Sequence, residues 1–376
     1  MYKIPPSRIR KLRTLALGKN STELTTIYPD KEKTTLIDLA SNDYLGLSRH
    51  PNVIEAANKI MKSEGVGSGG SRLLTGSRPI HLELENALSE WLQRESVLLF
   101  PSGFQANIAA VTALTDRNKI VIADRLIHHS LLVGVQASGA RLKRFIHNDM
   151  NHLERILKEH IDQNPLVLTE SLFSMEGTTA PIKKISNLCN QYNANLIVDE
   201  AHALGVMGSK GRGLCFEISE PVKIISGTFG KAFGSGGAFL ASNKSIRDIL
   251  IQTSGAFRYT TALAPPLAAA ALEALNLIKK NPHWGHLLQK ESQNWRKALA
   301  KQGWNTPPGS GPILSLIIGE DKLTLEYQDK LETRGLLSFA IRPPTVPEET
   351  SRLRLVLRKD LPSDTLEKLL SSLGSK

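Results

Sequence analysis

The chain is most informative at residues 228–237, which read Thr-Phe-Gly-Lys-Ala-Phe-Gly-Ser-Gly-Gly. This segment follows closely on an apolar run at 222–225 and contains one lysine, Lys231. Glycines let the backbone approach a ligand closely and adopt positive φ. A lysine in such a crowded place loses hydration, which favours its neutral, nucleophilic amine. Two interpretations are open: a surface lysine in a flexible glycine-rich loop, or a lysine that forms a Schiff base.

The composition is that of an ordinary globular protein. The chain has 376 residues, of which 41% are hydrophobic and 22% charged, enough for a large and a small domain. No apolar run has the length of a membrane helix, and no apolar core follows the basic N-terminus, so neither a spanning segment nor a secretory signal is expected. The two cysteines, Cys189 and Cys215, have no metal-type spacing. We therefore expect a cytoplasmic protein.

The formal net charge of +11 raises the question of a polyanionic partner. Lysine and arginine are spread along the chain, apart from a short cluster at 8–13. Neither a zinc-finger spacing nor an aromatic motif that stacks on bases is present. The charge therefore favours a phosphate-bearing small molecule or an acidic carrier protein over a nucleic acid.

Short apolar runs alternate with helix-like segments from about residue 96 onward. Continuous apolar character indicates strands that are buried on both faces, as in a mostly parallel sheet with helices on both sides. The runs lie at 97–100, 120–123, 166–168, 196–198 and 224–225, with a further one at 238–241. We expect an α/β fold with an N-terminal arm over residues 1–49, a large domain over 50–282 and a small α+β domain over 283–376.

Five polar clusters follow these runs, at the points where the predicted strands end. They begin at residues 101, 124, 169, 199 and 226. In open α/β sheets, ligands bind at the carboxyl ends of the strands. One such cluster is an ordinary loop, but five in succession favour a binding site.

Several side chains in these clusters suit a phosphorylated heteroaromatic ligand. Asp199 can hold a proton on a ring nitrogen, and His202 can address a substituent of the same ring; alternatively, they cap a turn and bond to backbone. Gly103 and Phe104 open a predicted helix, whose free N–H groups and dipole favour a phosphate. Thr228 adds a hydroxyl for the same anion. His128 is ambiguous, because its neighbour His129 is an equal candidate for the exposed position.

A lysine amine, a carboxylate for a ring nitrogen and an anion pocket match pyridoxal 5′-phosphate. With these residues in place, the sequence resembles the α-oxoamine synthases, which condense an amino acid with an acyl thioester and release CO2. Besides the lysine segment, the resemblance rests on Ser-Asn-Asp-Tyr-Leu-Gly-Leu at 41–47, Gly-Ser-Gly-Gly-Ser-Arg at 67–72, Asp-Arg-Leu at 124–126, Phe-Ser-Met-Glu-Gly at 173–177 and Asp-Glu-Ala-His at 199–202. It covers residues 38 to 358 and implies an aspartate-aminotransferase-like fold.

The resemblance also implies roles for individual residues. Lys231 would form the Schiff base with the cofactor, Asp199 would pair with the pyridine nitrogen, His202 would bond to the phenolic oxygen, and His128 would stack on the ring. The remaining cofactor contacts would come from Gly103, Phe104, Ser174 and Thr228. Substrate would contact Asn42, Arg342 and Thr345, with Arg342 on the amino-acid carboxylate. Family members are dimers with shared sites, so Ser68, Gly69, Gly70 and Ser71 would complete the site of the partner subunit.

The segment at 340–347, Ala-Ile-Arg-Pro-Pro-Thr-Val-Pro, is similar to family members that use L-alanine and a pimeloyl thioester, carried by coenzyme A or by acyl-carrier protein. Relatives that use glycine or serine remain an alternative, as does a cofactor-binding regulatory or nucleic-acid-binding protein. One departure concerns an arginine that relatives place shortly before a Tyr-Pro pair. This chain has Leu-Thr-Thr-Ile before Tyr28-Pro29, so that either Arg8, Arg10 or Arg13 replaces that arginine or the acyl group is held differently.

Overall fold

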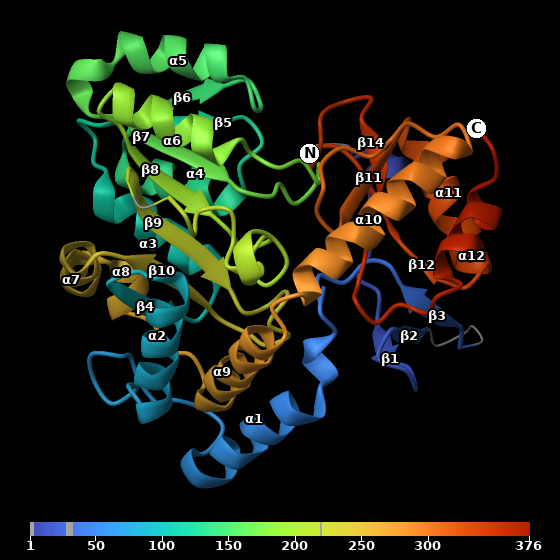
Figure 1. Ribbon diagram of the computed structural model, residues 1–376, viewed down its shortest axis with the longest axis horizontal. Helices are drawn as coiled ribbons and strands as arrows, with labels where there is room; N and C mark the ends of the chain where they lie inside the picture. The colour runs from blue at the N-terminus through green and yellow to red at the C-terminus, as the bar shows by residue number, and fades with distance from the viewer. Residues whose placement is uncertain (1–3, 28–32, 219) are drawn as a thin grey trace. The chain divides into compact units, whose positions relative to one another are not determined.

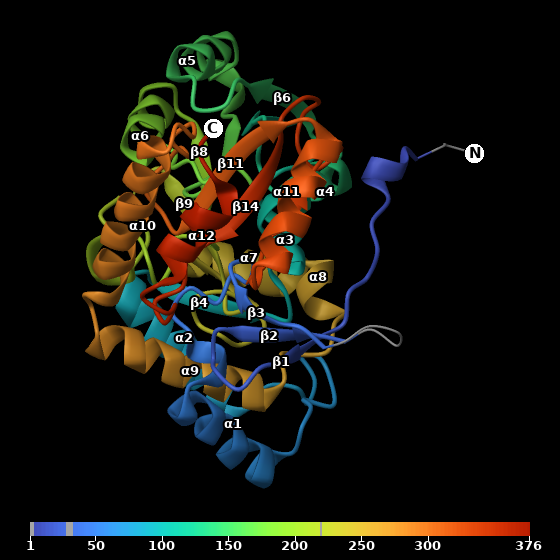
Figure 2. The same cartoon turned by 90° about the vertical axis from the view of Figure 1, so that its right-hand side faces the viewer.

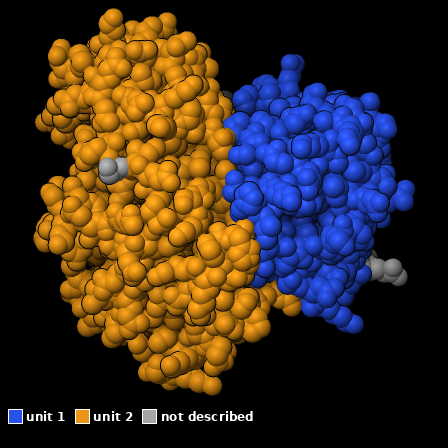
Figure 3. Space-filling view, viewed as in Figure 1, with its two compact units in different colours: residues 1–46, 174–178, 286–376 blue, residues 47–173, 179–285 orange. Residues whose placement is uncertain are grey.

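The computed structural model describes residues 4–27, 33–218 and 220–376. The chain divides into two compact units, which Figure 3 distinguishes by colour. The smaller unit contains Met1–Gly46, Ser174–Thr178 and His286–Lys376, and the larger unit contains Leu47–Phe173 and Thr179–Gly285. The N-terminal residues thus belong to the same compact unit as the C-terminal ones. The domain borders that the sequence predicts remain a prediction, because compactness alone does not show which part folds independently.

A seven-stranded sheet forms the centre of the larger unit (Figure 1). Its strands, in spatial order, are β4 (Ser96–Phe100), β10 (Ala238–Ser242), β9 (Val222–Thr228), β8 (Asn195–Asp199), β7 (Leu166–Glu170), β5 (Ile120–Asp124) and β6 (Arg141–Phe145). β10 runs antiparallel to its two neighbours, and the other adjacent pairs are parallel. β4, β5, β7, β8 and β9 therefore end at the same edge of the sheet. This arrangement confirms the predicted mostly parallel α/β fold.

Helices cover both faces of this sheet, as Figures 1 and 2 show for α3 and α4 on one side and α6 on the other. The helices of the larger unit are α1 (Pro51–Glu64), α2 (Pro79–Leu92), α3 (Gly103–Leu114), α4 (His129–Ser138), α5 (Met150–Glu159), α6 (Ile182–Gln191), α7 (Lys244–Thr253), α8 (Gly255–Arg258) and α9 (Pro265–Lys280), with 3-10 turns at Leu47–Arg49, Ile161–Gln163 and Ser209–Gly211. α3 and α4 pack closely at Gly134, where a Cβ would lie 2.9 Å from the Cβ of Val111.

The smaller unit has two sheets. The N-terminal segment supplies β1 (Leu15–Leu17), β2 (Glu23–Thr26) and β3 (Thr35–Asp38), and β12 (Leu336–Leu337) joins β3 in parallel. β1, β2 and β3 are neighbouring ribbons in Figure 2. The second sheet has the order β11 (Ile313–Gly319), β14 (Ser351–Val356), β13 (Phe339–Ile341). The helical segments are Pro6–Arg8, α11 (Asp321–Thr333), α12 (Thr365–Leu373) and most of α10 (Trp284–Lys301).

The five apolar runs of the sequence correspond to β4, β5, β7, β8 and β9, and the further run corresponds to β10. β6 was not predicted. Its sequence, Arg-Leu-Lys-Arg-Phe, is exposed at all positions except Phe145, as expected for an edge strand. Among the described residues, no helix combines the length and the apolar character that crossing a membrane requires.

Candidate active site

The polar clusters meet in one cavity of about 180 Å³ at the carboxyl edge of the central sheet. Its lining belongs entirely to the larger unit: Gly103, Phe104, Asn107, His128, Glu170, Asp199, Ala201, His202, Thr228 and Lys231. We call this cavity the strand-edge pocket. Of the residues that the sequence predicts for the cofactor, it contains all except Ser174.

Asp199 ends β8, and its carboxylate is held from two directions. Oδ2 accepts a hydrogen bond of 2.7 Å from Nδ2 of Asn107, and Oδ1 accepts one of 2.9 Å from the backbone N–H of Ala201. The residue is only 5% exposed. A carboxylate has about four lone-pair positions, so Asp199 can still accept a hydrogen bond from a protonated ring nitrogen.

The first turn of α3 provides the anion-binding part of the pocket. Ser102 caps the helix, because its Oγ accepts from the backbone N–H of Gln105 at 3.3 Å. A Cβ on Gly103 would lie 3.8 Å from Cβ of Thr228, which brings the helix start and the end of β9 together. The free N–H groups of a helix start and its dipole favour a phosphate.

The lysine segment at 228–237 is a packed turn. Thr228 Oγ1 donates to Gly237 O at 3.0 Å and accepts from Gly230 N at 3.2 Å, so the hydroxyl ties both ends of the turn together. Gly234 has φ +61°, and a Cβ there would lie 2.2 Å from the backbone nitrogen of Ser48. Within this frame Lys231 lines the strand-edge pocket. The interpretation as a flexible surface loop is therefore wrong.

His128 lines the pocket and His129 does not, although both residues are exposed to solvent. His128 is the N-cap of α4, where its Nδ1 accepts from the backbone N–H of Ser130 at 3.3 Å. Packing of protein atoms around the ring lowers the pKa of His128; the charge of Asp199 opposes this shift and that of Lys231 adds to it. A lowered pKa favours the neutral form of the imidazole at neutral pH.

Four of the remaining predicted site residues, Asn42, Ser174, Arg342 and Thr345, belong to the smaller unit. Arg354, which is 7% exposed, donates from Nε to Ser174 O at 2.6 Å and from Nη2 to Asn42 Oδ1 at 2.9 Å. It thereby joins two residues that the sequence predicts for cofactor and substrate. Sequence reasoning missed Arg354, although the Arg-Leu-Arg alternation of β14 places Arg352 and Arg354 on one face of that strand.

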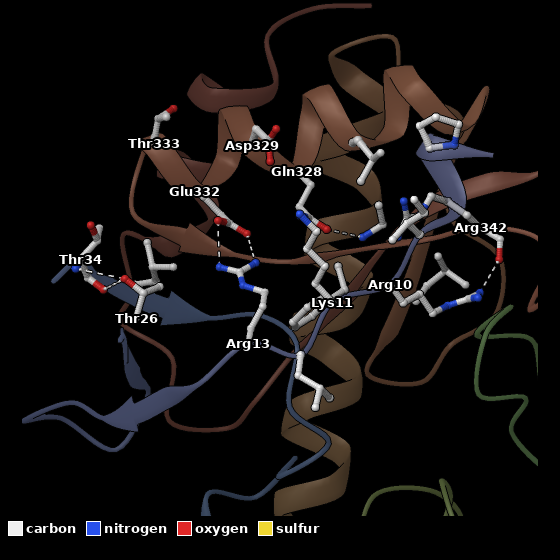
Figure 4. Close-up of a pocket in the computed structure, with 18 of the residues that line it drawn as sticks. Arg10, Lys11, Arg13, Thr26, Thr34, Gln328, Asp329, Glu332, Thr333 and Arg342 are labelled. Carbon is white, nitrogen blue, oxygen red and sulfur yellow. Dashed lines mark hydrogen bonds and ion pairs between the residues drawn. The ribbon is translucent and has the colours of Figure 1, made fainter. Parts of the chain in front are cut away.

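Thr345 N–H donates to Arg342 O at 3.1 Å, and Arg342 lies beside the N-terminal segment in the lining of a cavity of about 1100 Å³ within the smaller unit (Figure 4). We call it the arginine cavity. Arg10 donates to Thr345 Oγ1 at 3.0 Å and to Arg342 O at 3.4 Å. Arg8 pairs with Asp321 and Glu348, and Arg13 pairs with Glu332. The pair Tyr28-Pro29, before which relatives have the arginine that this chain lacks, lies outside the described residues.

The segment at 68–71 packs within the larger unit. Ser68 is 1% exposed and donates from Oγ to Leu263 O at 2.7 Å, while Gly70 O accepts from Ala262 N at 2.9 Å. Gly69 has φ +71° and Ser71 O accepts from Gly76 N. The predicted contribution of this segment to a partner subunit stays a prediction.

Asn107 is a pocket residue that sequence reasoning also missed. It lies four residues after Gly103 on α3, which places it on the same helix face as the predicted anion site. The four-residue spacing from Gly103 is the sequence signal from which Asn107 could have been predicted.

The donor set of the strand-edge pocket fits pyridoxal phosphate: an amine for the aldehyde, a carboxylate for the ring nitrogen and a helix start for the phosphate. Fold and site together define a pyridoxal-phosphate-dependent enzyme. The chain belongs to the aminotransferase class I and II family, whose model matches residues 34–373.

Three known proteins are similar over most of their length. The 8-amino-7-oxononanoate synthase of Alkalilimnicola ehrlichii is 39% identical over 343 residues, which is 90% of this chain and 88% of the relative. A structure of 8-amino-7-oxononanoate synthase from Francisella tularensis has a TM-score of 0.79 and 28% identity, covering 90% of this chain and 96% of that one. A structure of SPT with a PLP internal aldimine has a TM-score of 0.90 and 25% identity, covering 96% and 91%. Within its family, the chain is thus grouped with the 8-amino-7-oxononanoate synthases, which are pyridoxal-phosphate-dependent acyltransferases.

Proposed function

We propose that this chain condenses L-alanine with a pimeloyl thioester to give 8-amino-7-oxononanoate and CO2 in biotin biosynthesis. Coenzyme A or acyl-carrier protein carries the pimeloyl group and leaves as the free thiol. The observation that carries the proposal is the strand-edge pocket, in which Lys231, Asp199 and His202 line one cavity of about 180 Å³. The 39% identity with an 8-amino-7-oxononanoate synthase, over 90% of this chain, supports the choice of alanine and a pimeloyl thioester as substrates.

Each pocket residue has a role that follows from its chemistry. Lys231 holds the cofactor through its amine, and Asp199 keeps the ring nitrogen protonated. His202 would bond to the phenolic oxygen, and Gly103, Phe104 and Thr228 at the α3 start would hold the phosphate. When bound, pyridoxal phosphate supplies an electron sink for the α-carbon of the amino acid.

Two residues move or hold protons during the reaction. The amine of Lys231 would take the α-proton of alanine. The neutral imidazole of His128 donates a hydrogen bond to the thioester carbonyl oxygen, where negative charge develops. The lowered pKa of His128, caused by its packing, keeps the ring in this neutral form.

Substrate recognition is assigned to the smaller unit. Arg342 binds a carboxylate with its planar fork, and Asn42 and Thr345 contribute polar contacts, whereas Ser174 contacts the cofactor. Arg10 supplies the guanidinium for the acyl donor, because it contacts Thr345 and Arg342, whereas Arg8 and Arg13 each pair with carboxylates.

The proposed assembly is a cytoplasmic homodimer, with Ser68 to Ser71 of each subunit completing the site of the other. Both cysteines are free and buried, which agrees with a reducing compartment. Sedimentation of the purified protein tests the dimer, and a monomeric active enzyme contradicts it.

A substrate matrix tests the reaction. Alanine, glycine and serine are each combined with pimeloyl-CoA, pimeloyl-carrier protein and palmitoyl-CoA, and CO2 and ketone product are measured. We expect turnover with alanine and a pimeloyl thioester. Turnover that prefers glycine, or serine with palmitoyl-CoA, overturns the proposal, and the two pimeloyl donors compared at equal concentration identify the carrier.

A further inference from the structure

Two buried polar residues connect Asp199 to His128 through the interface of α3 and α4. Asn107 on α3 is 2% exposed, and Ser130 on α4 is 0% exposed. Nδ2 of Asn107 donates to Asp199 Oδ2 at 2.7 Å and to Ser130 Oγ at 2.9 Å. The opposite amide orientation would place two oxygens 2.7 Å apart, so the amide nitrogen must face the carboxylate.

The hydrogen bonds diverge from the amide of Asn107, which donates to Asp199 on one side and, through Ser130, leads to His128 on the other. The backbone N–H of Ser130 donates to Nδ1 of His128, which therefore carries no hydrogen in this arrangement. Ser130 Oγ lies 2.7 Å from the same Nδ1 and must donate its hydroxyl hydrogen to it. In the neutral ring the remaining hydrogen is then on Nε2. The side-chain amide of Asn107 thus fixes the carboxylate of Asp199, and through Ser130 it fixes the tautomer of His128.

The packing around these residues leaves little room for them to rearrange. Gly134 lets α4 approach α3 so closely that a Cβ there would lie 3.3 Å from the Cα of Ile108. A buried hydrogen-bonding group that loses its partner keeps the full cost of its lost hydration. Removing one member therefore affects the other members of the connection.

We propose that Asn107 and Ser130 form a bridge of positioning residues, which fixes the carboxylate of Asp199 for the cofactor ring and holds His128 as an Nε2–H donor. We call these two residues the Asn107–Ser130 bridge. Neither residue touches the reacting atoms in this account; each acts through Asp199 or His128. The inference rests on the proposed roles of those two residues.

The test uses the full-length enzyme with Asn107→Asp and Ser130→Ala. Asn107→Asp keeps the side-chain size but replaces the donor by an acceptor facing Asp199. Thr112→Val is the matched control, because Thr112 lies on α3 and its hydroxyl bonds only to backbone oxygens of the same helix. The measurements are the dissociation constant of pyridoxal phosphate from apoenzyme, the visible circular dichroism of the bound cofactor, and kcat and KM.

We expect Asn107→Asp to weaken cofactor binding by about tenfold or more, since hydrogen bonds to charged groups are among the stronger ones. The visible circular dichroism should change because the ring is held less firmly. Ser130→Ala should lower kcat with KM for alanine altered less than about twofold, which marks an effect on the transition state. The double variant should be no worse than Asn107→Asp alone, because both substitutions break the same connection. Thr112→Val should match the wild type.

Two results overturn the bridge: wild-type cofactor affinity and dichroism in Asn107→Asp, or fully additive effects in the double variant. If Asn107→Asp does not fold, Ser130→Ala carries the test, and unchanged kcat and dichroism overturn the bridge. Asp199→Ala separates the two proposals. If Asp199→Ala retains cofactor affinity, the role of Asp199 itself is contradicted. If Asp199→Ala loses cofactor affinity but Asn107→Asp binds the cofactor as tightly as the wild type does, only the bridge is contradicted.

Discussion

The strand-edge pocket and the arginine cavity both gather charged side chains, but they hold them in opposite ways. In the pocket of about 180 Å³, Asp199 is buried and bonded to Asn107 and to backbone. In the cavity of about 1100 Å³, Arg10 and Lys11 are exposed, and the guanidinium of Arg13 pairs with Glu332 (Figure 4). The first site is built around buried, hydrogen-bonded groups, and the second includes exposed long side chains.

This difference indicates which of the two sites is more sensitive to substitution. Buried polar groups are strongly coupled, because a lost partner is not replaced by water. Exposed ion pairs contribute little, since solvent and mobile side chains compensate. We therefore expect changes in the pocket to have large effects and changes in the cavity to have small ones.

The largest effect is expected for Lys231→Ala. Loss of the amine removes both the covalent hold on the cofactor and the group that takes the α-proton, so activity should fall by about 10²–10⁴-fold. Absorption spectra should lose the visible band of the bound cofactor. Lys223→Ala, on the strand β9 that precedes the lysine segment and paired with Glu220, is the control and should keep both the band and the activity. A visible band that survives in Lys231→Ala contradicts the assignment.

Gly134→Val tests whether the pocket depends on close helix packing. The new side chain would meet Val111 and force α3 and α4 apart, at a cost of about 1–3 kcal/mol in unfolding free energy. Urea denaturation of the apoenzyme measures that cost, and cofactor titration should show weaker binding. Unchanged stability and unchanged cofactor affinity would mean that the interface is looser than the structure implies.

The pH dependence of stability tests a second buried carboxyl beside Asp199. Burial raises the pKa of Glu200 from 4.5 to about 7. Between these values the folded state binds more protons at Glu200 than the unfolded state, so this group's contribution is complete below pH 4.5 and is lost as pH rises through 7. The loss is at most about 1.4 kcal/mol per pH unit.

Glu200→Gln removes that contribution, because glutamine does not titrate. Unfolding free energies of wild type and variant, measured by urea denaturation across pH 4.5 to 7, should therefore differ in slope. Parallel slopes would show that folding does not shift the pKa of the Glu200 carboxyl.

The smallest effect is expected in the arginine cavity. Arg10→Ala should raise KM for the pimeloyl donor by about two- to fivefold, the size typical of an exposed charge contact. Cofactor spectra should not change. Arg13→Ala, whose charge is already paired with Glu332, serves as the comparison and should leave KM unaltered. Equal increases in KM for Arg10→Ala and Arg13→Ala would contradict a specific role of Arg10 in binding the pimeloyl donor.

The strand edge was predictable because it depends on local patterns. Each apolar run forms a strand that is buried on both faces, and parallel strands present their polar ends at one edge, so Lys231, Asp199 and Thr228 were placed together correctly. β6 escaped this criterion, because its Arg-Leu-Lys-Arg-Phe sequence has no continuous apolar run.

Contacts between distant elements were not predictable from one sequence. β12 has two residues and pairs with β3 across about three hundred positions of the chain, so no local pattern marks it. The Asn107–Ser130 bridge depends on how closely α3 and α4 approach each other. Gly134 permits this close approach, but a single glycine in the sequence does not predict it. Arg354 was missed for a similar reason, since its contacts to Asn42 and Ser174 join three separate parts of the sequence.

The central claim is that the strand-edge pocket holds pyridoxal phosphate on Lys231. Borohydride reduction of the holoenzyme, followed by proteolysis and mass spectrometry, fixes the cofactor to the lysine that holds it. We predict a single phosphopyridoxyl label on the peptide that contains Lys231, and no label in Lys231→Ala. A label on a different lysine, or an equal label in Lys231→Ala, would contradict the account.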